Sequence, residues 1–334
     1  MAALWSRKRS AADDSPTEPV RRDYAPGGTY RRATTFALLR RTVTEFQEDN
    51  LSDWAAALTY YGLLALFPAL IALVAIVGLF ADPQSTTKTI TQIVTQIGPS
   101  SGAKTFSGPI HSITSNRSAA GILFVAGLAA ALWSASGYVG AFMRASNVIY
   151  ETPEGRPIWR LRPLQMFLTL VVVILVAALA MGLVLTGPIV DAVAGPIGIG
   201  STATTIWDIA KWPVMLLVVV VIISVLYYAT PNVKVRGLRW VTPGSVVAVV
   251  GWLIASALFA LYVANFGSYD KTYGTLGGVV VLLVWMWITN LAILFGQELN
   301  AERERGAEIV ERIPRAEREI QLEPRSTPKE QRTT

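Results

Sequence analysis

Uncharged polar side chains are the groups that could act on a ligand inside the long apolar stretches of this sequence. The candidates for lining a path are tyrosines, a serine and two asparagines: Tyr60, Tyr61, Ser136, Asn147, Tyr150, Tyr228, Tyr273 and Asn290. Hydroxyl and amide groups can hold a neutral or amphiphilic solute. They can equally tie two membrane helices together, at about 0.6 kcal/mol per hydrogen bond on average. The sequence leaves both roles open.

Charged side chains stand at the edges of these stretches. Asp53, Arg144 and Glu298 are candidate rim charges, and further carboxylates lie near them: Glu45, Glu48, Asp49 and Glu302. Carboxylates can bind Mg²⁺ and serve a hydrolase. Their spacing here matches no metal motif, and no histidine accompanies them. A solvated helix face is therefore the favoured interpretation, with no metal site.

The apolar stretches themselves are free of Asp, Glu, Lys, Arg and His. There are six, at residues 55–81, 119–143, 164–187, 212–230, 242–264 and 275–297. Proton-driven carriers commonly place ionisable groups at mid-membrane, so the sequence argues against a proton relay through the bilayer centre. The chain has no cysteine, which removes disulfides and thiol chemistry. No cofactor is expected.

Each stretch is long enough to cross a bilayer as a helix, since about 20 apolar residues span the hydrocarbon core. Only 16% of the residues are charged, against about 25% in soluble domains. No soluble core could bury six such helices. The sequence therefore predicts an all-α membrane helix bundle with six transmembrane helices at residues 33–305, and a bend at Pro68 in the first of them.

The distribution of basic residues predicts the orientation. Of the 29 Lys and Arg residues, 24 fall in the two termini and the 144–163 and 231–241 loops, on one side of the membrane. Cytoplasmic loops carry this excess, so both termini are expected in the cytoplasm. The basic surplus is explained by orientation, and no nucleic acid partner is expected.

The remaining segments have distinct compositions. Residues 1–32 and most of 306–334 are polar, without periodicity, and are predicted to be disordered cytoplasmic tails. Residues 84–117 show two helically spaced apolar runs and are expected to form an external amphipathic hairpin. An amphipathic N-terminal helix is predicted at 33–52, with Phe36, Leu39, Val43 and Phe46 on one face. It could lie on the membrane surface or pack against the end of the bundle.

Several short motifs resemble the YihY/BrkB family of bacterial inner-membrane proteins. They occur in order: Ala57 to Pro68, Leu132 to Ser136, Asn147 to Tyr150, Tyr227 to Pro231, Pro243-Gly244, Tyr273 to Gly277, and Trp285 to Asn300. Two positions depart from the family pattern: Ala65 stands where serine is usual, and Gln297 where alanine is usual.

The resemblance implies a multi-pass protein of the bacterial inner membrane. Some members of the family have been labelled ribonuclease BN, and others carry a virulence label. The favoured hypothesis is a transporter, channel or lipid-handling protein for a neutral or amphiphilic solute, with membrane lipids as partners and self-association open. A membrane-bound ribonuclease and a scaffold that transports nothing are the alternatives. The residues favour a protein that is not an enzyme.

Overall fold

The computed structural model describes residues 35–80, 117–184, 200–235, 240–265 and 275–327. Within these ranges the chain forms helices and connecting segments, with one isolated bridge between Val233 and Pro324. The helices are α2 (Thr35–Glu48), α3 (Leu51–Phe80), α6 (Arg117–Ile149), α7 (Ile158–Val184), α9 (Gly200–Ala229), α10 (Pro243–Asn265) and α12 (Thr275–Val310). The predicted 1–32 tail, nearly all of the 84–117 hairpin and Tyr273 lie outside the described residues. The all-α class is confirmed.

Five of these helices are long and apolar enough to cross a membrane: α6, α7, α9, α10 and α12. Between 11% and 29% of each candidate span is buried within the chain. Most of their apolar surface is therefore exposed, as expected for helices that face lipid or other helices. Helix α3 covers the first predicted span and continues through Pro68; the bend there, like the count of six spans, stays a prediction.

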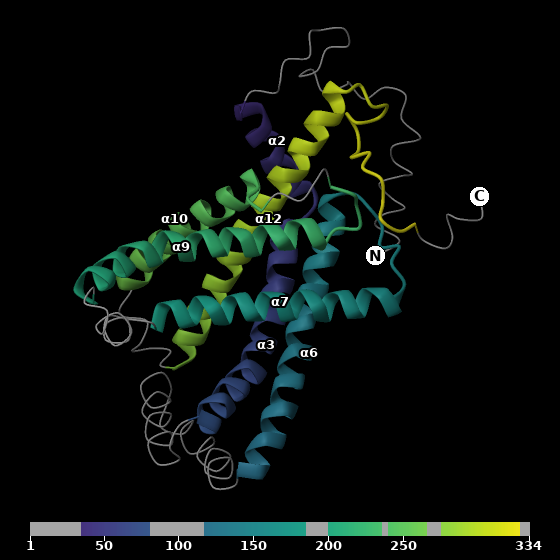
Figure 1. Cartoon of the computed structure of the whole chain (residues 1–334). Coiled ribbons are helices and arrows are strands. Elements are labelled where there is room, and N and C mark those ends of the chain that lie inside the picture. The colour runs from purple at the N-terminus through teal and green to yellow at the C-terminus, as the bar shows by residue number, and fades with distance from the viewer. Residues whose placement is uncertain (1–34, 81–116, 185–199, 236–239, 266–274, 328–334) are drawn as a thin grey trace.

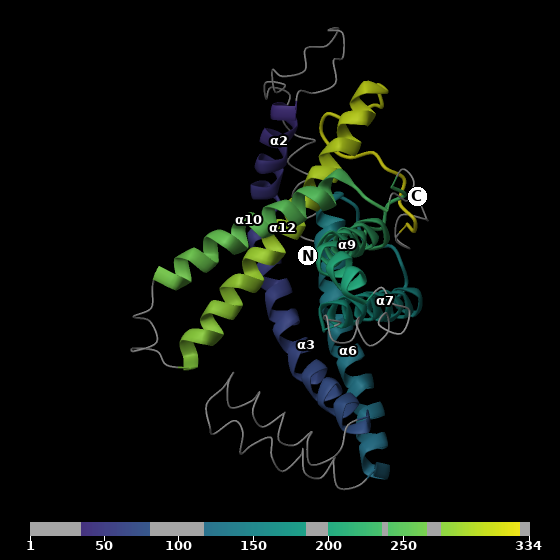
Figure 2. The ribbon, with the colours of Figure 1, turned by 60° about the vertical axis from the view of Figure 1, so that its left-hand side comes forward.

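The long helices lie in three pairs that also contact one another. Helix α3 packs along α6, α10 along α12 and α7 along α9, while α12 also contacts α3 and α6 also contacts α7. In Figure 1, α7 and α9 run across α3 and α6, and Figure 2 shows α7 and α9 close to end-on. The α10–α12 pair diverges from the others in Figure 2. The three pairs therefore point in different directions.

One end of the molecule gathers most of the polar contacts. We call it the polar end: helix α2, residues 149–157, residues 230–235 and 240–242, and residues 297–327 of α12 and the chain that follows it (Figure 1). Helix α2 begins the polar end and is separated from α3 by Asn50, which has a φ of 52°. Asparagine tolerates this left-handed conformation better than most residues. The sharp turn lets α2 contact both α3 and α12.

Helix α2 packs against the bundle mainly through its polar side, and most of its apolar side chains stay exposed. Phe46 contacts Phe295 of α12, with ring centroids 5.9 Å apart, while Phe36, Leu39 and Val43 remain exposed. One of the two placements left open by the sequence, packing against the end of the bundle, is therefore found, while placement on the membrane surface stays a prediction. The polar side chains of α2 meet α12, and most of its apolar face points outward.

The C-terminal segment differs from the disordered tail predicted at 306–334. Helix α12 continues to Val310, and residues 311–327, which we call the strap, run back across the polar end. Ile320 and Ala316 of the strap are buried. The low apolar content of this segment concealed its order, because backbone and charged groups hold it in place: Lys234 N donates to Glu323 O at 2.9 Å, and Arg325 N donates to Asn232 O at 2.9 Å.

Candidate functional site

A cavity of about 280 Å³ lies at the polar end, where the ends of α6, α9 and α12 meet the start of α10. Its lining is mixed aromatic, polar and charged: Tyr150, Tyr227, Tyr228, Val235, Thr242, Pro243, Asn300, Arg303, Glu304 and Ala307. Tyr150 and Tyr228 are among the candidates predicted from sequence. The cavity is therefore at a membrane edge and not at the centre of the spans.

The start of α10 forms one wall of the cavity. Thr242 caps this helix: its Oγ1 accepts from Ser245 N at 3.1 Å, and Ser245 Oγ accepts in return from Thr242 N at 3.1 Å. Pro243 suits the first helical position because it needs no hydrogen bond there. Asn300 of α12 completes the wall, since its Oδ1 accepts from Gly244 N at 2.9 Å.

Close backbone contact joins this wall to α12. A Cβ atom added to Gly244 would lie 2.0 Å from Gly296 O, and one added to Gly296 would lie 2.3 Å from Gly244 O. Only glycine allows this approach. The motifs Pro243-Gly244 and Gly296 to Asn300, far apart in sequence, are thereby brought to one site.

Charge and apolar surface meet at the cavity. Arg303 is exposed and Glu304 is half-buried, so the lining offers both signs of charge. One turn beyond Pro243, Val246 and then Val250 expose apolar side chains on α10. A pocket that carries charged and polar groups beside an apolar helix surface matches the two ends of an amphiphile.

A second polar feature is buried beside the cavity. We call it the ionic cluster: Arg41, Glu45, Asp49, Glu151, Glu298, Glu302 and Arg305. Arg305 is its centre. The Nη1 of Arg305 lies 2.9 Å from Glu45 Oε1 and 3.3 Å from Glu302 Oε1, and its Nη2 lies 2.9 Å from Glu151 Oε1. Arg41 Nε lies 3.0 Å from Glu302 Oε2.

The ionic cluster corrects the interpretation of these carboxylates as a solvated helix face. Glu298 is 2% exposed, Glu302 is 1% and Glu45 is 8%. They are buried because α2 lies against α12 and brings Glu45 and Arg41 onto the same face as Glu298 and Glu302. Isolated buried charges are costly, so carboxylates in such a place need partners. In the parts of the chain that are described, no three His, Cys, Asp or Glu residues are arranged to hold a metal ion.

Glu151 enters the ionic cluster through an uncommon backbone conformation. It follows α6 with a φ of 49°, which places a non-glycine residue in the left-handed region. Its carboxylate accepts from Arg305 Nη2 at 2.9 Å and from Ile320 N of the strap at 3.0 Å. The turn after α6 therefore serves to join α12 to the strap.

Tyr150 lies between the cavity and the ionic cluster. It is buried and lines the cavity. Burial raises the pKa of its phenol, and the charges of Glu304 and Glu298 raise it further. The phenol therefore stays a neutral hydrogen-bond donor. It interacts electrostatically with Glu304 of the cavity and with Glu298 of the ionic cluster.

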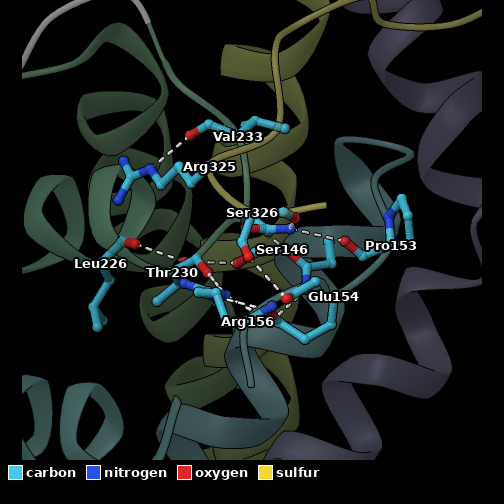
Figure 3. A network of polar contacts seen from close by, with 12 residues as sticks. Ser146, Pro153, Glu154, Arg156, Leu226, Thr230, Val233, Arg325 and Ser326 are labelled. Carbon is cyan, nitrogen blue, oxygen red and sulfur yellow. Dashed lines mark hydrogen bonds and ion pairs between the residues drawn. The ribbon is translucent and has the colours of Figure 1, made fainter. Parts of the chain in front are cut away.

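A network of polar contacts joins α6, α9 and α12 close to the cavity and the ionic cluster, and Figure 3 shows part of it. Ser146 Oγ lies 2.8 Å from Thr230 Oγ1 and within 3.1 Å of both amide atoms of Gln297. Gln297 is fully buried. It is the position at which this chain departs from the alanine of the family pattern, and its amide joins α12 to α6.

Asn147, a predicted path residue, belongs to this network. Its Oδ1 accepts from Asn232 N at 2.8 Å, and its Nδ2 donates to Glu154 Oε2 at 3.0 Å. Arg156 donates twice more to Glu154, at 2.7 Å each (Figure 3). Partial burial opposes ionisation of Glu154, but these bonds outweigh it and lower the pKa of the carboxyl. Asn147 thus holds the 150–157 loop against residues 230–232.

The remaining candidates lie along α3, α6 and α12, away from the cavity. Asn290 is buried, with Oδ1 accepting from Tyr138 Oη at 2.8 Å and Nδ2 donating to Thr59 Oγ1 at 3.1 Å. Ser136 Oγ donates to Trp133 O of its own helix at 2.6 Å. The contacts of Asn290 tie α12 to α6 and α3, whereas that of Ser136 stays within α6.

The paired tyrosines of α3 face a different environment. Tyr60 is 59% exposed and its ring lies 5.5 Å from that of Tyr61. The guanidinium of Arg144 lies 5.7 Å from the Tyr61 ring, so one predicted rim charge and one predicted path residue come together. Asp53 is exposed in the first turn of α3. None of these residues lines the cavity.

Sequence reasoning did not single out several residues of the site, above all Arg303, Arg305, Asn232 and Arg325. One signal was available for Arg305. Glu298, Glu302 and Arg305 recur at helical spacing beyond the last apolar run, which places them on one face of a continuing helix. Nothing comparable marks Asn232 or Arg325, because their partners lie on other segments.

Comparison with known proteins places the chain in a family. The sequence model of the family described as "Virulence factor BrkB" matches residues 42–319. The ribonuclease-like protein YfkH of Bacillus subtilis is 36% identical over 250 residues, covering 74% of this chain and 88% of YfkH. A UPF0761 membrane protein of Vibrio vulnificus is 26% identical over 312 residues, covering 87% and 92%. No solved structure matches.

The matched region contains every described helix except the start of α2, and with it the cavity and all of the ionic cluster except Arg41. It carries five helices able to cross a membrane, and relatives over most of its length are membrane proteins. The resemblance read from the sequence motifs is confirmed. This chain belongs to the BrkB family and is an integral membrane protein.

Proposed function

We propose that this protein moves an amphiphilic, lipid-like solute across or between the leaflets of the bacterial inner membrane, holding its polar head in the cavity at the polar end. The cavity carries the proposal. Its charged and polar groups would hold the head, and the exposed apolar side chains of Val246 and Val250, which follow the lining residue Pro243 at helical spacing, would contact the tail.

The neutral interior of the spans supports the same class of solute. A fully charged solute in the bilayer centre would need compensating charge, whereas Asn290, Tyr138 and Thr59 supply only amide and hydroxyl groups, already bonded to one another. Charged contacts are concentrated at the polar end. By the positive-inside rule we place this end, with both termini, in the cytoplasm. The exposed span surfaces would contact lipids or a second copy of the chain.

The test is leaflet exchange of a fluorescent phospholipid in liposomes containing the purified protein. Ala307→Phe puts a large side chain into the cavity lining and is expected to slow exchange on the order of tenfold, equal to about 1.4 kcal/mol. Val310→Phe is the matched control: it adds a similar side chain on the same helix, at an exposed position that does not line the cavity. Equal rates in empty and protein-containing liposomes would refute the proposal.

Ribonuclease activity is the alternative, and its supporting observation is the name of YfkH. That activity would require carboxylates able to act on RNA, yet Glu45 and Glu302 are tied to arginines inside the ionic cluster. Mg²⁺-dependent RNA cleavage by the purified protein, lost on changing both Glu48 and Asp49 to alanine, would favour this alternative over transport.

A further inference from the structure

We propose that Glu298 is a proton-binding site: its carboxyl binds and releases a proton inside the ionic cluster. The first observation is the balance of charge. Three carboxylates of the cluster, those of Glu45, Glu151 and Glu302, contact its two guanidinium groups, those of Arg41 and Arg305. Glu298 is a further carboxylate beside these contacts.

The second observation is how the two cations are used. Arg305 contacts Glu45, Glu151 and Glu302, and Arg41 contacts Glu302. Among the described residues, none makes an ion pair with Glu298, and its Oε2 is buried without a hydrogen-bond partner there. A carboxylate oxygen desolvated in this way is strongly destabilised when ionised.

The third observation concerns the surroundings of Glu298. The charged groups that act on it are Asp49 in the turn after α2, Glu45 of α2, and Glu302 and Arg305 of α12. Three of these four are carboxylates, which oppose a further negative charge. The ligand best suited to a small, buried and negatively biased position is a proton.

A metal ion is the competing ligand, and the geometry does not favour it. Ca²⁺ takes six to eight oxygen ligands, and Mg²⁺ demands near-octahedral geometry. No set of three candidate ligands in the described ranges converges on one point, and the oxygens of Glu302 and Glu45 face arginines. A proton requires only the one free oxygen.

Glu298 is placed to report on the cavity. Tyr150 lines the cavity and is affected electrostatically by both Glu298 and Glu304. A polar head that displaces or neutralises Glu304 would change the potential at Tyr150 and Glu298 together. Coupling of proton release to cavity loading rests on the proposed function, whereas proton binding by Glu298 does not.

The experiment measures the proton without measuring transport. The purified full-length protein in detergent is melted over a range of pH. An unfolded glutamic acid ionises near pH 4.3. Above that pH the unfolded chain has released a proton that folded Glu298 retains, so the wild-type melting temperature is expected to fall as pH rises until Glu298 itself ionises. Glu298→Gln mimics the protonated acid and should remove this part of the fall.

Glu48→Gln is the matched control, since it makes the same change at an exposed position of α2. It should keep the wild-type pH dependence. Infrared spectroscopy gives a second readout that needs no folded variant: the C=O stretch of a protonated carboxylic acid should be present in the wild type at neutral pH and disappear in alkali. In Glu298→Gln that band should be missing.

Three results would overturn the proposal: no protonated carboxyl band in the wild type at neutral pH, an unchanged band and pH dependence in Glu298→Gln, or stabilisation of the wild type but not Glu298→Gln by millimolar MgCl₂ at fixed pH. Inactive liposomes combined with a positive infrared result would reject the transport function and leave the proton site standing.

Discussion

Buried polar residues in this protein fall into two classes. Some form hydrogen bonds to other helices and hold the helices together, and others keep an unbonded polar atom that could bind a ligand. Asn290 bonds to Tyr138 and Thr59, so its donor and acceptor groups are both used within the chain. Glu298 has a buried oxygen that no group in the described structure completes. Burial alone does not separate these cases, because both residues are nearly inaccessible.

Asn290→Leu should therefore destabilise the protein without abolishing binding at the cavity. It removes two buried hydrogen bonds and leaves the Tyr138 hydroxyl unpaired, for an expected loss of about 1–2 kcal/mol. Thermal unfolding in detergent measures this. Ser256→Ala removes the hydrogen bond from the exposed Trp285 and should change stability by no more than about 0.5 kcal/mol. Equal effects of the two changes would show that Asn290 is no tie.

Helices and their bounds could be predicted from sequence far better than their partners. Each apolar run became a helix, because hydrophobicity and length report membrane burial directly. The packing of α2 on α12 was not predictable, since periodicity indicates which face is apolar but not which element covers it. In α2 the covered face even carries Glu45 and Arg41, so the charged residues were assigned to solvent. The order of the strap was not predicted either, because its low apolar content gives no sign of the backbone hydrogen bonds that hold it in place.

Glycines at the α10–α12 contact provide a test at the scale of elements. Gly244→Ala should force α10 away from α12, because the new Cβ would lie 2.0 Å from Gly296 O, at a cost of about 1–3 kcal/mol. The control is Gly251→Ala on the same helix, where a Cβ meets nothing within 4 Å; it should be neutral or stabilising by up to about 1 kcal/mol. The unfolding temperatures of the two variants measure these changes in stability.

The same change at Gly244 should also reduce activity by more than its stability loss explains. Gly244 N donates to Asn300, which lines the cavity, and Gly244 directly follows Pro243, which lines it too. If Gly244→Ala and Gly251→Ala behaved alike in both assays, the close contact between α10 and α12 would be refuted.

At the scale of the whole molecule, the polar end concentrates the cavity, the ionic cluster and both ends of the described chain. The topology that we propose places all of it on one side of the membrane. The chain contains no cysteine, so single cysteines can be introduced without removing others.

Glu311→Cys, just beyond α12 in an exposed position, should be labelled by a membrane-impermeant maleimide only after the cells are opened. Asp270→Cys, in a loop predicted to be external, should be labelled in intact cells. Labelling of both residues in intact cells, or of neither, would contradict the six-span orientation with internal termini.

The pairing of α2 with α12 also has a consequence for biosynthesis. Glu45 and Arg305, which lie 2.9 Å apart, are 260 residues apart in sequence. A ribosome adding about 5–20 residues per second exposes α2 for many seconds before its partner exists. Glu45 stays exposed to solvent during this time, and the polar end can form only after α12 and the strap have been synthesised. Helix α2, the first of the described helices to be made, is thus among the last to be buried.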